Sequence, residues 1–117
     1  MNNRSVGNEF ENIACEYLIS HGFEIIERNF HASRIGEIDI IAKKASELFF
    51  VEVKGRKTIA FGSPAEAVSQ KKLSKIEIAS QYFLNKHNYK EIRTNYIVIE
   101  ILSINGATEI NIIDELY

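Results

Sequence analysis

Apolar residues recur with a helical period at the start of the chain and with a strand-like pattern in several later segments. The helical spacing predicts a first helix from Val6 to Ser20, and Gly22 follows it as a natural C-terminal cap. Three segments rich in Ile, Val and Phe then predict strands, at Phe23 to Phe30, Glu37 to Ala42 and Leu48 to Lys54. Because short polar connections join these strands, we expect an antiparallel meander.

The second half of the chain returns to a helix and then to strands. A Ser-Pro pair suited to a helix start predicts a helical region from Ser63 to about Lys86. Arg93 to Leu102 predicts a fourth strand, and the Asn105-Gly106 turn predicts a hairpin with an edge strand at Glu109 to Ile113. A helix joins the third and fourth strands, so these two should be parallel. The pattern as a whole predicts an α/β fold, with a mixed sheet that has a helix on each face.

Charged residues interrupt the third predicted strand, although its alternation suggests burial on both faces. Phe49, Val51 and Val53 share one face, whereas Glu52 and Lys54 share the other with Phe50. Burying a charged side chain without a partner destabilises the folded state by several kcal/mol. Asp39 interrupts the preceding strand in the same way, so Asp39, Glu52 and Lys54 should form one small patch.

The composition is ordinary for one globular domain, and we expect residues 1–117 to form a single domain. The chain has 117 residues, of which 45% are hydrophobic and 26% are charged. Cys15 is the single cysteine, which excludes an internal disulfide and favours a reducing cytoplasm. The N-terminus has no apolar core of a signal peptide, and no apolar run approaches the length of a membrane span. We therefore expect a cytoplasmic protein without a membrane partner.

The charge of the chain limits how it could bind nucleic acid. Its formal net charge is −2, with 14 basic and 16 acidic residues, so it has no global basic surface. Binding to nucleic acid would depend on a local basic groove.

Asp39, Glu52 and Lys54 suit metal-assisted chemistry on a phosphate. Carboxylate oxygens, with waters and a backbone carbonyl, can hold Mg²⁺ or Mn²⁺. Lys54 lies two residues beyond Glu52, about 6.6–6.8 Å along the strand. Its amine could position or deprotonate a water or stabilise a phosphate, while the ion lowers the pKa of bound water.

Two motifs resemble those of a known family. Gly36 to Ile41, followed by Phe50 to Arg56, is similar to the signature of the YraN family of predicted endonucleases. That family resembles archaeal Holliday-junction resolvases of the PD-(D/E)xK nuclease superfamily. Supporting similarities extend the resemblance over nearly the whole chain, at Gly7 to Leu18, Ser20 to Phe23 and Glu27 to Asn29, and at Ala67-Val68, Lys72 and Ala79. The resemblance implies a restriction-endonuclease-like αβββαβ core with a C-terminal edge strand. It also implies a Mg²⁺- or Mn²⁺-dependent endonuclease that cleaves DNA, with branched or junction DNA as the suggested substrate.

The resemblance also implies roles for individual residues. Asp39 and Glu52 match metal-binding acids, Lys54 matches the catalytic lysine, and Glu11 matches a helix acid that completes the site. Arg56 and Lys72 match basic positions expected to face the phosphate backbone. Apart from the resemblance, we also expect Arg34, Lys57 and Lys75 to contact nucleic acid. Glu37 matches a family position without an assigned role, and Asn95 stands where many relatives carry an acid.

Two other interpretations remain open. The protein could be a non-catalytic module that binds nucleic acid or another protein and retains the nuclease-like fold. Alternatively, the charged residues could be purely structural, as Glu52–Lys54 and Asp39–Arg ion pairs.

The edge strand Glu109 to Ile113 could also pair with a second copy of the chain and form a homodimer. The sequence leaves DNA or RNA, branched or linear substrate, and the physiological metal undecided.

Overall fold

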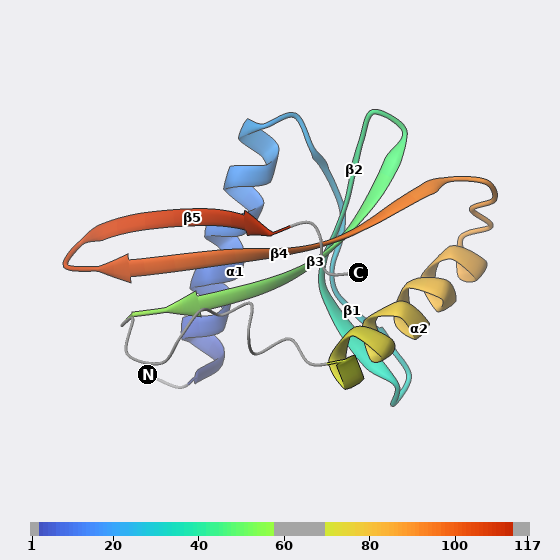
Figure 1. Ribbon diagram of the computed structural model, residues 1–117, viewed down its shortest axis with the longest axis horizontal. Coiled ribbons are helices and arrows are strands. Elements are labelled where there is room, and N and C mark those ends of the chain that lie inside the picture. The colour runs from blue at the N-terminus through green and yellow to red at the C-terminus, as the bar shows by residue number, and fades with distance from the viewer. Residues whose placement is uncertain (1–2, 58–69, 114–117) are drawn as a thin grey trace.

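A five-stranded sheet with one helix on each face forms the body of the protein (Figure 1). The computed structural model describes residues 3–57 and 70–113. Its elements in chain order are α1 (Asn3–Ser20), β1 (Glu24–Ala32), β2 (Gly36–Lys44), β3 (Glu47–Arg56), α2 (Gln70–Lys86), β4 (Arg93–Ile104) and β5 (Ala107–Ile113).

The strands lie in the sheet in the order of the chain, β1-β2-β3-β4-β5. β1, β2 and β3 form an antiparallel meander, β3 and β4 are parallel, and β5 returns antiparallel to β4 at the edge. The predicted mixed sheet, the parallel central pair and the C-terminal edge strand are all confirmed. The arrangement is consistent with the expected αβββαβ core.

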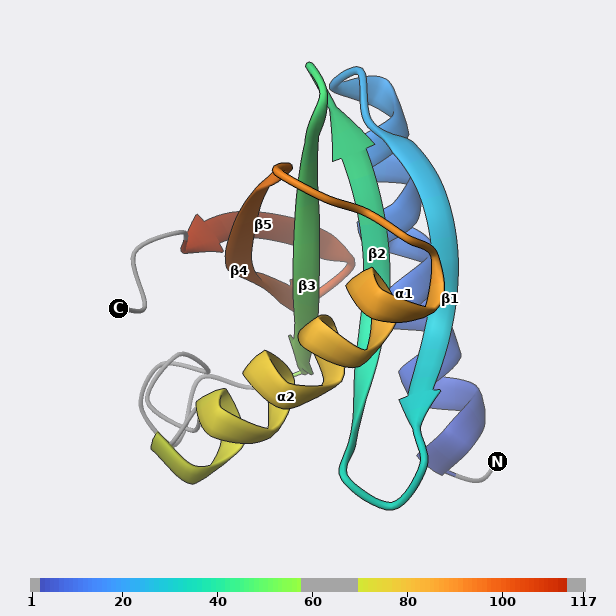
Figure 2. The same ribbon diagram turned by 90° about the vertical axis from the view of Figure 1, so that its right-hand side faces the viewer.

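Two hydrophobic cores lie on opposite faces of the sheet because apolar side chains alternate along β3. Val51 faces α1, where it joins Phe10, Ala14 and Leu18 in one core. Phe50 faces α2, in the other core, which also contains Phe30, Leu48, Ala79 and Phe83. Figure 2 shows α2 in front of the sheet and α1 behind it. The predicted burial of β3 on both faces is confirmed.

The element boundaries differ from the predicted ones mainly at the hairpins. Ala45 and Ser46 both have positive φ, at 51° and 65°, so the β2–β3 turn needs only two residues and the ladder extends to Lys44 and Glu47. The Asn105-Gly106 turn has the same geometry, as predicted, with φ of 52° and 80°. β1 continues to Ala32, which moves His31 from the predicted loop into a strand.

Two further outcomes concern the helices. The predicted helix start at Ser63-Pro64 lies outside the described residues. Among those described, neither helix is both long and apolar enough to cross a membrane.

Candidate active site

The sheet changes its regular pattern at Asp39. Ile38 packs in the core beneath α2, but Ile40, two residues later, packs in the core beneath α1. In a regular strand these two side chains would share one face. Asn29 on β1 lies opposite Asp39 on β2, between the Arg28↔Ile40 and Phe30↔Ile38 pairs. Its φ of 53° departs from the extended conformation of a strand. The irregularity in both strands therefore sets the orientation of Asp39.

The Asp39 carboxylate lies where β2 and β3 separate. The paired register of these strands runs from Lys44↔Glu47 to Ile40↔Val51. Beyond this point the Val53 N–H donates a hydrogen bond to Asp39 Oδ2 at 2.9 Å. A side chain thus replaces the backbone of β2 as the partner of β3, which leaves an opening between the strands.

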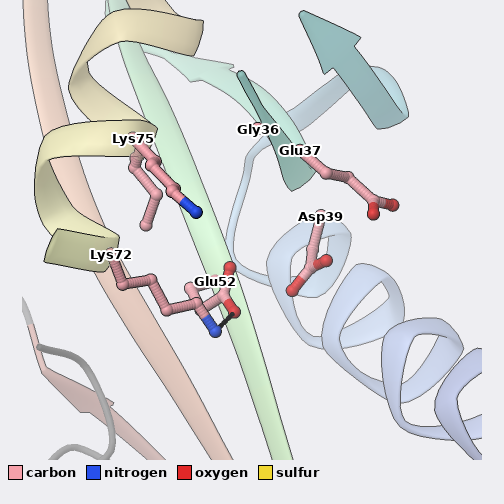
Figure 3. Close-up of a pocket in the computed structure, with 7 residues that line it drawn as sticks. Gly36, Glu37, Asp39, Glu52, Lys72 and Lys75 are labelled. Atoms are coloured by element: carbon pink, nitrogen blue, oxygen red, sulfur yellow. Dashed lines mark ion pairs between the residues drawn. The ribbon is translucent and has the colours of Figure 1, made fainter. Parts of the chain in front are cut away.

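A pocket lies at this opening, beneath the first turns of α2 (Figure 3). Asp39 and Glu52 point toward each other across it, and Lys72 reaches down from α2 toward Glu52. The lining residues are Gly36, Glu37, Asp39, Glu52, Lys72, Lys75 and Ile76. The pocket therefore brings acids from two strands together with ammonium groups from a helix.

Two ammonium groups share one oxygen of the Glu52 carboxylate. Lys72 Nζ lies 2.6 Å from Glu52 Oε1, and Lys54 Nζ lies 3.4 Å from the same atom. Glu52 is only 8% exposed. The predicted Glu52–Lys54 ion pair is present, whereas the described residues contain no ion pair between Asp39 and an arginine.

Burial and neighbouring charges change the protonation of this cluster. Burial, together with the charge of Glu52, raises the pKa of Asp39 to about 7 against the opposing Val53 hydrogen bond. Burial also lowers the pKa of Lys54, and the neighbouring Lys72 adds to this effect. For Lys72, burial acts to lower the pKa, but its hydrogen bonds with Glu52 and Lys54 outweigh that effect and raise it.

Glu11 does not line this pocket, although its charge also contributes to the raised pKa of Asp39. It is 6% exposed on α1, and both of its donors come from β1. Arg28 Nε donates to Glu11 Oε1 at 2.9 Å, and Asn29 Nδ2 donates to the same oxygen at 3.0 Å. Glu11 therefore lies near the opening but is held by two donors of its own.

Two of the five predicted basic residues line the pocket, and the other three lie in or near the strands that form it. Lys72 and Lys75 line it. Arg34 is exposed in the turn between β1 and β2, while Arg56 ends β3 and Lys57 is exposed directly after it. Lys72 and Lys75 thus contribute positive charge to a pocket whose acidic lining residues are Glu37, Asp39 and Glu52.

The two residues left without a role have structural partners. Glu37 lies at the pocket edge, points away from Asp39 and has its carboxylate 3.8 Å from His31 Nε2 (Figure 3). Asn95 donates hydrogen bonds to Glu47 Oε1 and to the Leu48 carbonyl, both at 3.2 Å. Asn95 therefore connects the starts of β3 and β4 and is absent from the pocket lining.

Glu100 is a residue near the site that the sequence interpretation missed. It is 9% exposed on β4 and lies opposite Lys54 in the parallel register, on the same face of the sheet. Its signal was available, because it is an acid within the otherwise apolar segment Tyr96 to Ile101. Glu52 is likewise an acid within an apolar strand segment.

The donor set fits a hard divalent cation. Because the N–H and C=O of one strand residue point to the same side, the Val53 carbonyl should face the β2 side of β3, where the Val53 N–H meets Asp39. Asp39, Glu52 and this carbonyl would supply three oxygen ligands. The described residues contain no cluster of three or more His, Cys, Asp or Glu that could hold a metal by itself. Mg²⁺ tolerates such a sparse set, because it usually keeps several waters.

These features define a class: an α/β protein whose acids and lysines meet at an opening of a mixed sheet. Within this class, the chain belongs to the uncharacterised protein family UPF0102, whose model matches residues 10–104. The expected YraN-like kinship is confirmed at this level, and the relationship to nucleases stays a prediction.

Relatives from several bacteria support this membership over most of the chain. A UPF0102 protein of Caldicellulosiruptor bescii is 42% identical over 120 residues, covering 100% of both chains. One from Clostridioides difficile is 46% identical over 101 residues, covering 86% of this chain and 88% of the relative. One from Dictyoglomus turgidum is 47% identical over 108 residues, covering 91% and 90%.

Proposed function

We propose that this protein is a Mg²⁺- or Mn²⁺-dependent endonuclease that hydrolyses phosphodiester bonds in DNA. The observation that carries the proposal is the convergence of Asp39 and Glu52 beneath two lysines, where the sheet opens. A half-buried Asp39 beside a buried Glu52 is costly in a purely structural role, because the two carboxylates repel each other, and a divalent cation between them would remove that cost.

The two acids would hold the ion together with the Val53 carbonyl. The ion, when bound, supplies a more acidic water and neutralises charge on a phosphate. Asp39 carries a pKa of about 7 in the metal-free protein because burial and Glu52 disfavour its charge. A cation would favour the ionised form instead, so metal binding and deprotonation of Asp39 should be linked.

Lys54 would act on the attacking water. Burial lowers the pKa of its ammonium, which makes the neutral amine more accessible as a proton acceptor. Its side chain is 26% exposed, so it remains open to solvent and substrate.

The basic residues around the opening would bind the phosphate backbone. Lys75 lines the pocket, while Arg34 and Lys57 are exposed near strand ends. Because the whole chain carries a net charge of −2, affinity would come from this local surface and should fall steeply with salt. Branched or junction DNA is the proposed substrate, on the resolvase resemblance.

The proposal is tested by cleavage of matched linear, flap and four-way-junction DNA with Mg²⁺, Mn²⁺ or EDTA. The Asp39→Asn, Glu52→Gln and Lys54→Ala variants should each lose cleavage and keep their circular dichroism spectra. Glu77→Gln is a matched control, since it removes an exposed acid from α2 outside the pocket. Cleavage by Asp39→Asn at the parental rate would refute the assignment.

One observation favours a second candidate, a binding module without catalysis. Lys54 and Lys72 already neutralise Glu52, so the cluster is satisfied without a metal. DNA binding without cleavage by any divalent ion would support the binding module, and salt-insensitive binding would point to a protein partner. A purely structural role of the ion pair would instead predict that replacing Glu52 and Lys54 together with apolar residues is tolerated or stabilising.

A homodimer through the edge of β5 also stays a prediction. The exposed Ile112 on this strand is the feature that motivates it. Sedimentation of the parent chain and of Ile112→Lys tests the prediction, because a β5 interface would dissociate in the variant.

A further inference from the structure

We propose that the Lys72 ammonium occupies the cation position at Glu52 in the metal-free protein, and that a divalent ion binds by displacing it. This inference rests on the proposed metal site at Asp39 and Glu52. It adds a regulatory role for α2, which would exchange an internal cation for an external one.

The geometry identifies Lys72 as the main counter-cation of Glu52. Its Nζ lies 2.6 Å from Glu52 Oε1, at the short end for a charge-assisted hydrogen bond. Lys54 is farther from the same oxygen, at 3.4 Å. Because Glu52 is buried, few waters can compensate its charge and the nearest ammonium takes that role.

A divalent ion on the Glu52 carboxylate and the Lys72 ammonium would compete for the same negative charge. Mg²⁺ requires oxygen ligands at about 2.0–2.1 Å. An ammonium bonded to the same oxygen would then lie within a few ångströms of the ion, where the two positive charges repel. The Glu52 carboxylate should therefore bind one of the two cations well, but not both, whichever of its oxygens the ion takes.

Lys72 is better placed to leave than Lys54. Lys54 extends from β3 itself, two residues from Glu52, so the sheet keeps it beside the site. Lys72 reaches Glu52 from α2, and 35% of its side chain is already exposed (Figure 3). Rotation about its flexible stem would carry the ammonium to the pocket mouth. There it could bind a phosphate, so metal loading would also strengthen binding of nucleic acid.

Removal of the competing charge should tighten metal binding. Because Glu52 is buried and the Lys72 side chain is partly exposed, the gain should be about tenfold, after allowance for solvent screening at Lys72. Lys72→Met keeps most of the apolar stem and removes the charge. Lys72→Gln does the same with a polar end, in case the first variant folds poorly. Lys72→Arg keeps the charge and should not tighten binding.

Lys75→Met is the matched control for metal binding. Lys75 lines the same pocket on the same helix, but the ion pairs of the described residues do not join it to Glu52. Its removal should therefore change metal affinity much less than removal of Lys72.

The experiment is a calorimetric titration of the full chain with Mn²⁺, repeated by electron paramagnetic resonance of free Mn²⁺. Lys72→Met and Lys72→Gln should bind about tenfold more tightly than the parent, and should melt at lower temperature without metal. Equal or weaker binding by both folded variants would overturn the inference.

A second set of variants separates this inference from the proposed function. Asp39→Asn should abolish Mn²⁺ binding in the parent and in the Lys72→Met background. If the parent binds Mn²⁺ through Asp39 but Lys72→Met binds no more tightly, the inference alone fails. If neither protein binds Mn²⁺, the proposed function and the inference both fail.

Discussion

The raised pKa of Asp39 predicts that this residue destabilises the metal-free protein as the pH rises. The pKa increases from 3.8 to about 7 on folding because burial and Glu52 disfavour the carboxylate. Between these values the folded state holds a proton that the unfolded state has released. The stability associated with the protonated form is therefore complete below the unfolded pKa and is lost as the pH rises through the folded pKa.

The size of this effect follows from the shift. Going from about pH 5 to about pH 8, Asp39 should lower the free energy of unfolding by about 2–3 kcal/mol. Asp39→Asn removes this titration and keeps an oxygen that can accept the Val53 N–H. The difference in stability between the parent and the variant should therefore widen with pH, in favour of the variant.

Urea unfolding in EDTA at several pH values measures this difference directly. Titration of the other groups largely cancels, since both proteins share them. A parent-minus-variant difference that stays constant across this pH range would refute the reasoning about Asp39. Addition of Mg²⁺ should reverse the sign of the difference at high pH, because the parent alone would gain binding energy.

Three further predictions test other parts of the site. Gly55→Ala should destabilise the protein by about 1–3 kcal/mol in urea, because a Cβ there would overlap the ring of Phe10; an unchanged midpoint would contradict this close approach. Arg28→Ala should lower the free energy of unfolding by about 1–3 kcal/mol in the same assay, because it removes a hydrogen-bond donor from the buried Glu11. An unchanged free energy would mean that the hydrogen bond from Asn29 alone is sufficient to satisfy the Glu11 carboxylate. Mg²⁺ at about 100 times its Kd should stabilise the parent by about 2.7 kcal/mol in thermal melts and leave Asp39→Asn unchanged.

Much of the fold could be predicted from the sequence because its signals are local. Alternation in Leu48 to Lys54 indicated burial on both faces, and the Asn105-Gly106 pair indicated a tight hairpin. The helix between the third and fourth strands required a parallel pair, which the structure contains. These features depend on neighbouring residues and short connections.

The details of the site depend on tertiary geometry that no local pattern encodes. The change of face between Ile38 and Ile40 arises jointly in two strands, at Asn29 and Asp39. The position of α2 over the sheet decides that Lys72, rather than Lys54, is nearest to Glu52.

Two acids illustrate the limits of sequence interpretation in opposite ways. Glu11 was expected to complete the site directly or through water; its carboxylate accepts hydrogen bonds from Arg28 and Asn29 outside the pocket lining, and its role in the site stays a prediction. Glu100 was overlooked within a strongly apolar strand, and it lies beside Lys54 in register. The position of Glu11 depends on how α1 packs against the sheet, which no local pattern encodes. Glu100 could have been identified from the sequence, because, like Glu52, it is an acid within an apolar strand.

The most direct test of the central claim is a single-turnover cleavage assay on junction DNA, with the parent and Lys54→Ala side by side in Mg²⁺ or Mn²⁺. The account predicts metal-dependent cutting by the parent that the variant lacks, although both bind the DNA. Absence of cutting by the folded parent with either ion, while it still binds the DNA, would contradict the nuclease assignment and favour a binding module.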